Sequence, residues 1–212
     1  MLKTILAPLF PLLLLFSNGS DYSLNRVSPS GPQADVATLE KMIVADGSAS
    51  LDLDVNRLNG IRSRSEMSTL RFGLVPNSFF TILVLNNELR GPLPSSMALV
   101  PQNTVALPAA LNASYQQLVV ENTEPGAPYE LIVRDGKSGF VFFNIEGHNL
   151  DYDANAHLFS IQAGRLLLSK EFATALGRPA ETGTVVGKIS VTATMRAIEV
   201  TRFVNGETRS DV

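Results

Sequence analysis

Much of the chain alternates hydrophobic and polar positions in short runs, the pattern that predicts β-strands with one buried face. The clearest case is residues 50–55, where Leu51, Leu53 and Val55 alternate with polar residues. Residues 79–85 (FFTILVL) are apolar at nearly every position, which predicts a strand covered on both faces. Further strands are expected at 70–75, 97–100, 116–121, 129–134, 140–145, 158–162, 165–168 and 184–195, and residues 197–204 either continue the last strand or pair back on it.

Turn residues separate these runs at the short spacing typical of antiparallel sheets. Asp46-Gly47 predicts a hairpin between 36–44 and 50–55, although the apolar spacing of 36–44 also fits a helix. Ala163-Gly164 predicts a second hairpin and Asn205-Gly206 a third. Because only six residues follow Gly206, we expect either a short edge strand or a chain that is truncated and continues beyond Val212.

One segment carries the start and stop signals of a helix. Ser169 is a suitable N-cap, Glu171 lies in the first turn, and Gly177 and Pro179 mark the end. About ten short strands with one short helix near 169–177 predict an all-β fold. We expect an antiparallel β-sandwich of the jelly-roll type, formed by residues 36–212 as a single domain.

The N-terminus predicts secretion. Lys3 precedes an apolar run from Ile5 to Phe16, followed by small polar residues, so residues 1–20 are expected to be a signal peptide. Residues 21–35 are expected to form an exposed leader. The apolar run is shorter than the roughly 20 residues of a membrane span, and no other such run follows. We therefore expect a secreted, extracellular protein (periplasmic in a Gram-negative cell) without a membrane span after cleavage.

The charge and the cysteine content of the chain exclude some classes of function. The chain has 17 basic and 20 acidic residues, and loss of Lys3 with the signal peptide leaves 16 against 20. No basic patch stands out, which argues against nucleic acid as a partner. The chain contains no cysteine, so it has neither disulfides nor thiolate metal ligands and must be stabilised by burial of its core.

A polar segment between two predicted strands is the candidate metal site. Asp-x-Asp-x-Asn at 151–155 resembles the start of a calcium loop, but Ala156 and Gln162 stand where an EF-hand needs Gly and Glu. Two histidines nine residues apart are candidate zinc ligands if they meet across a hairpin. The alternative is a solvated loop whose side chains bond their own turn. The candidate ligands are Glu146, His148, Asp151, Asp153, Asn155 and His157, with Ca²⁺ as the only candidate cofactor.

Other chemistries find little support in the sequence. No Gly-x-Ser-x-Gly nucleophile motif is present, and both histidines lie in one segment. Gly136-Lys137-Ser138 resembles the end of a phosphate-binding loop, but Leu131 replaces the first glycine and no helix is expected to follow. The chain has no tryptophan to form a platform for sugars.

These observations favour a secreted, non-enzymatic module with a binding, adhesion or structural role outside the cell. Its expected ligand is an extracellular protein or glycan, and open strand edges would allow self-association. The alternative is a secreted hydrolase or metal-dependent enzyme that uses residues 146–157.

Overall fold

The computed structural model describes residues 36–61, 64–204 and 207–211. Antiparallel strands dominate these residues and the helices are short, so the predicted all-β fold is confirmed. The strands are β1 Val36–Asp54, β2 Met67–Leu74, β3 Thr81–Leu85, β4 Glu88–Pro92, β5 Ser95–Pro101, β6 Leu118–Asn122, β7 Leu131–Asp135, β8 Val141–Glu146, β9 Asn149–Asp153, β10 Leu158–Leu168, β11 Val185–Val204 and β12 Glu207–Asp211.

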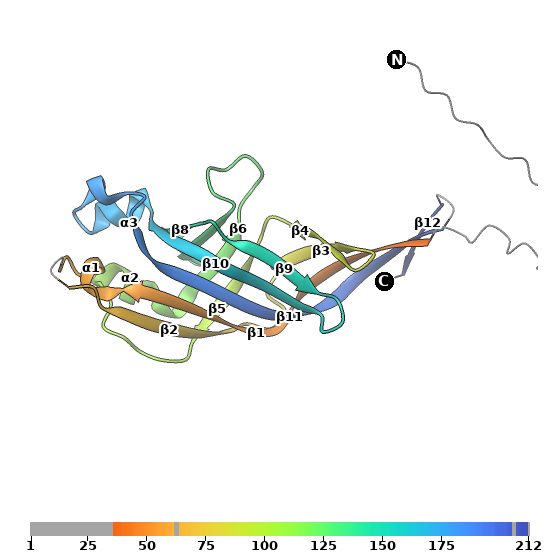
Figure 1. Ribbon diagram of the computed structural model, residues 1–212, viewed down its shortest axis with the longest axis horizontal. Coiled ribbons are helices and arrows are strands. Elements are labelled where there is room, and N and C mark those ends of the chain that lie inside the picture. Colours follow the sequence, from red (N-terminus) through yellow and green to blue (C-terminus); the bar gives the residue numbers. More distant parts are fainter. Residues whose placement is uncertain (1–35, 62–63, 205–206, 212) are drawn as a thin grey trace, which may run out of the picture. The chain divides into compact units, whose positions relative to one another are not determined.

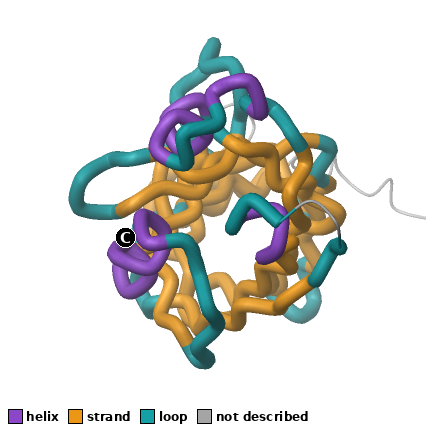
Figure 2. The backbone as a smooth tube through the Cα atoms, turned by 90° about the vertical axis from the view of Figure 1, so that its left-hand side faces the viewer, coloured by secondary structure: helices purple, strands orange, loops and turns teal. Residues whose placement is uncertain are grey.

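All twelve strands belong to one hydrogen-bonded sheet, and part of this sheet closes on itself. The order is β12-β11-β10-β8-β7-β6-β5-β2-β1-β3-β4, with β9 paired to β10 and an additional pairing of β11 with β1. Hydrogen bonds therefore run in a ring through β1, β2, β5, β6, β7, β8, β10 and β11. Figure 2 shows this ring from one end, with helices near its rim.

The two longest strands close the ring. β1 and β11 run side by side (Figure 1), with antiparallel register from Val36 opposite Val204 to Leu53 opposite Gly187. Ala197–Val204 therefore continues the preceding strand. Asn205-Gly206, the predicted hairpin turn, lies outside the described residues, although β12 pairs antiparallel with the end of β11.

Two predicted hairpins are corrected by the structure. Asp46-Gly47 does not turn the chain, because it lies inside β1 at a register shift between Val44 and Asp46. Ala163-Gly164 likewise lies inside β10, at a register shift between Ile161 and Gly164. In both cases the turn-forming residues make an irregularity that bends a continuous strand, as a β-bulge does.

The inward faces of the strands enclose one hydrophobic cluster. Its largest fully buried side chains include six phenylalanines, each of which stabilises the fold by roughly 1.5–3 kcal/mol through burial. Phe172 of α3 reaches this cluster and packs edge-on against Phe142 and Phe143 of β8. The six are Phe72, Phe80, Phe142, Phe143, Phe159 and Phe172.

Short helices gather at one end of the ring (Figure 1), which we call the helix-capped end. They are α1 Val55–Leu58, α2 Ala109–Ser114, α3 Lys170–Ala175 and the 3₁₀ turns η1 Tyr115–Gln117 and η2 Pro179–Glu181. The predicted helix near 169–177 is confirmed as α3, and the Ser169 hydroxyl accepts a hydrogen bond from Phe172 N at 2.9 Å. α1 and α2 were not predicted, because four and six residues are too few to show a helical period, and the equally short α3 was found only through its cap residues.

Residues 1–35, with the predicted signal peptide and leader, lie outside the described part of the chain. Within the described ranges, no helix combines the length and apolar character needed to cross a membrane.

Candidate functional site

The six predicted metal ligands are spread over the last residue of β8, β9 itself and the turns that flank β9. β9 exposes Asn149, Asp151 and Asp153 and half-buries Leu150 and Tyr152, as expected for a strand with one face on the core. His148 precedes this strand and His157 follows it. A strand of this length spans roughly 17 Å. The two imidazoles therefore lie near opposite ends of β9 and do not face each other across a hairpin.

Each predicted ligand at the ends of β9 has its own partner. Glu146 forms an ion pair with Arg165 Nη2 at 2.5 Å. Nε2 of His148 lies 3.3 Å from Oε2 of Glu130. Nδ1 of His157 lies 3.0 Å from the Tyr152 hydroxyl.

Among the other candidate ligands, Asp153 bonds the backbone of its own turn. Asp153 Oδ1 accepts hydrogen bonds from the backbone N–H groups of Asn155 and Ala156, at 2.9 and 3.2 Å. Asp151 points outward from β9 opposite Ser160. Within the part of the chain that the structure describes, no three His, Asp or Glu residues are grouped as a metal ion would require. A metal at residues 146–157 stays a prediction.

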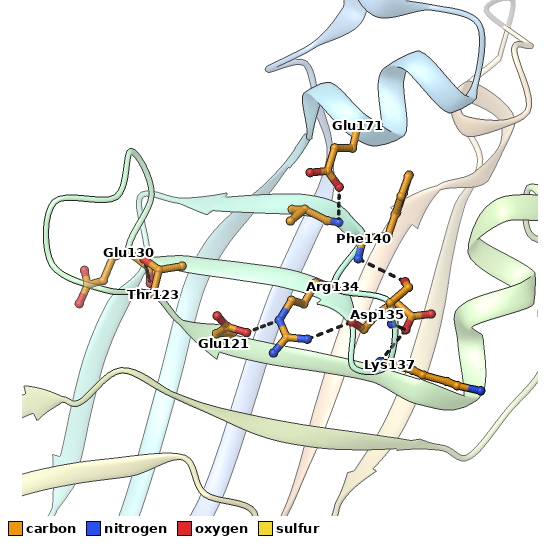
Figure 3. A network of polar contacts seen from close by, with 10 residues as sticks. Glu121, Thr123, Glu130, Arg134, Asp135, Lys137, Phe140 and Glu171 are labelled. Atoms are coloured by element: carbon orange, nitrogen blue, oxygen red, sulfur yellow. Dashed lines mark hydrogen bonds and ion pairs between the residues drawn. The ribbon is translucent and has the colours of Figure 1, made fainter.

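The most deeply buried aspartate belongs to the β7–β8 turn (Figure 3). Asp135 is 2% exposed, and its Oδ1 accepts hydrogen bonds from Lys137 N and Ser138 N, both at 2.7 Å. Burial raises the pKa of this carboxyl, but hydrogen bonds from Ser114, Ser138, Lys137 and Gln117 outweigh burial and hold the pKa well below its usual range. In the Gly-Lys-Ser turn, the backbone N–H groups of Lys137 and Ser138 therefore bind a carboxylate of the same chain.

A polar hollow opens at the helix-capped end. It encloses about 490 Å³, within the range of small-ligand sites. Two chain segments far apart in sequence form it: the end of β1 with α1 and the following loop, and the η2 turn. Among the residues that the structure describes, the lining is formed by Asp54, Arg57, Ile61, Arg64, Ser65 and Glu181.

Asp54 joins the two sides of the loop that borders this hollow. Its Oδ1 accepts a hydrogen bond from Arg57 N at 3.0 Å as the N-cap of α1, and its Oδ2 accepts one from the Ser65 hydroxyl at 2.8 Å. Burial raises the pKa of Asp54, but hydrogen bonds from Arg57, Ser65 and Glu66, together with the nearby Arg57 charge, outweigh burial and lower the pKa. The ionised form therefore holds α1 and the Ser65 segment together.

Arg178 fixes the other side of the hollow. Its guanidinium donates to the carbonyl oxygens of Arg57 and Leu58, both at 2.8 Å, and pairs with Glu181 at 3.1 Å. This side chain is only 17% exposed. Because Arg178 lies 121 residues after Arg57, it ties η2 to the last turn of α1 and sets the distance between them.

Sequence reasoning missed this hollow. In the sequence, Pro179 indicates only the end of a helix. The signal that was available is local: an Asp three residues before Arg57, at the position of an N-cap. Nothing local indicates that residues 178–181 pack beside it.

Comparison with known proteins finds no matching family model, no matching curated protein and no matching solved structure.

Proposed function

We propose that this protein is a secreted, non-enzymatic all-β module that binds a partner outside the cell through its helix-capped end. The N-terminal pattern of Lys3, an apolar run and small polar residues supports secretion. A cysteine-free chain whose core is enclosed by one sheet suits a module that keeps its shape without disulfides.

The hollow beside α1 is the observation that carries the binding role. Its lining is fixed by hydrogen bonds from both sides: Asp54 holds the Ser65 segment and Arg178 holds α1. A preformed, partly charged hollow binds a ligand at a low cost in conformational entropy.

The test uses the full chain, expressed with its N-terminus and collected from the medium or periplasm. The collected protein is titrated against a panel of extracellular polysaccharides and matrix proteins by calorimetry. Products are followed by chromatography, and bound metal is measured before and after dialysis against EDTA.

We expect saturable binding to at least one panel member, no turnover of any, and a melting temperature that EDTA leaves unchanged. Retention of the protein in the cytoplasm, or the absence of binding to every panel member, would contradict the proposal. Turnover of a panel member, or a bound ion whose removal costs more than about 2 kcal/mol of stability, would favour the enzymatic alternative instead.

A further inference from the structure

We propose that the hollow at the helix-capped end binds an anionic group, a carboxylate, sulfate or phosphate, between the side chains of Arg57 and Arg64. This inference rests on the proposed binding function and names the ligand class of that same site. It is carried by the way in which the charges around the hollow are distributed.

Both carboxylates that line the hollow already have partners within the protein. Asp54 accepts hydrogen bonds from Arg57 N, the Ser65 hydroxyl and Glu66 N, the last at 3.4 Å. Glu181 pairs with Arg178. The two carboxylates therefore hold the segments that line the hollow in place.

The guanidinium groups of Arg57 and Arg64 differ from these two carboxylates in their contacts. Neither makes a hydrogen bond or an ion pair with any residue in the described ranges, although each carries five N–H donors. Both residues are exposed and line the same hollow. The described lining thus holds two carboxylates that are already engaged by protein groups and two arginines whose guanidinium groups face the hollow.

The geometry of guanidinium suits oxyanions. Its planar fork donates two parallel hydrogen bonds to a carboxylate, sulfate or phosphate, and such charge-assisted bonds are roughly twice as strong as neutral ones. The backbone around Arg57 is held in place, because its N–H donates to Asp54 and its carbonyl accepts from Arg178. Ile61 adds an apolar wall, which a ring or a short aliphatic part of the ligand can contact.

The experiment titrates the ¹⁵N-labelled mature protein with three kinds of probe. Inorganic sulfate and inorganic phosphate test the bare anion. An oligogalacturonate tests the same charge on a glycan, and its methyl ester is the matched neutral ligand. We expect shifts of the Arg57 and Arg64 amide resonances with a charged probe and none with the ester, and affinity that falls as salt is raised.

The double variant Arg57→Gln/Arg64→Gln removes the two charges. The matched control is Arg71→Gln/Arg90→Gln, which removes two exposed arginine charges outside the hollow. We expect the first variant to bind the charged probe at least about tenfold more weakly, as the loss of charge-assisted hydrogen bonds gives. The control variant should bind like the unaltered protein, and equal melting temperatures would show that both variants are folded.

Failure of the inference can be told apart from failure of the proposed function. If the protein binds a panel partner but the double variant binds it equally well, the anion site is overturned and the binding function stands. Equal binding of the oligogalacturonate and its ester would also overturn the anion site. If the unaltered protein binds no probe and no panel partner, both proposals are overturned.

Discussion

At the scale of single residues, the sequence indicated the helix cap at Ser169 but gave no sign of contacts between residues far apart in the chain. Ser169 was predicted as an N-cap because its partner, Phe172 N, is three residues away. Glu146 was predicted as a metal ligand, and its ion pair with Arg165 was not, because only the pairing of β8 with β10 brings Arg165 close. A carboxylate in a sequence is equally compatible with a metal ligand and with half of an ion pair, and only its neighbours decide between them.

Asp135 gives a prediction at this scale. We expect Asp135→Asn to lower the free energy of unfolding at pH 7 by about 2–3 kcal/mol, because an amide replaces a buried carboxylate that accepts several hydrogen bonds. The folded-state pKa lies below the unfolded value of 3.8, so ionisation stabilises the native state above that value. The stability difference between the two proteins should therefore shrink as the pH falls below about 5. Urea unfolding at a series of pH values measures it.

Asp153→Asn is the matched control. Asp153 also accepts two backbone N–H groups in a turn, but it is exposed. Its replacement should change the stability by no more than about 0.5 kcal/mol. A loss for Asp135→Asn as small as that of the control would show that burial of this carboxylate contributes little.

At the scale of elements, the sequence predicted the strands better than their connections. Asp46-Gly47 and Ala163-Gly164 are turn signals on local chemistry, yet both lie inside long strands. Glycine is needed at these two positions because neighbouring strands lie close to them. A Cβ on Gly47 would lie 2.4 Å from Thr192 O, and one on Gly164 would lie 2.8 Å from Ile189 Cγ2. These glycines are needed where strands approach closely, as glycine in a strand often is.

Gly187 tests this close approach between β1 and β11. A Cβ at this position would lie 2.1 Å from Asp52 O, a backbone atom that moves only if the strand pairing is disturbed. We expect Gly187→Ala to destabilise the protein by roughly 2–4 kcal/mol, as overpacking against backbone does. Thermal and urea unfolding measure the loss.

Gly73→Ala is the control for that substitution. Gly73 also lies in a strand, but the nearest atom to its added Cβ is Nε2 of Gln102, 3.1 Å away at the end of a flexible side chain. Its replacement should cost less than about 1 kcal/mol. Equal losses for the two variants would mean that the contact between β1 and β11 is not tightly packed at Gly187.

At the scale of the whole molecule, the sequence predicted the fold class, and the closure of the sheet and the hollow at the helix-capped end were beyond it. Alternation identifies which strand face is buried, but it carries no information on which strands pair. The pairing of β1 with β11 joins strands from opposite ends of the described chain. The hollow depends on the same closure, because Arg57 follows β1 and Glu181 precedes β11.

The closure of the sheet predicts which amides exchange only through global unfolding and which exchange through local opening. β1 and β11 are each paired on both sides along much of their length, whereas β4 and β9 each pair with one strand only. We expect hydrogen exchange of amides at 49–53 and 187–193 to require global unfolding, so that their exchange free energy falls with urea at the slope of the whole protein. Amides of β9 that face β10 should exchange through local opening, with little dependence on urea. Residue-resolved exchange by NMR measures both. Amides of β1 that exchange through local opening while β9 stays protected would show that the ring does not form the stable centre of the fold.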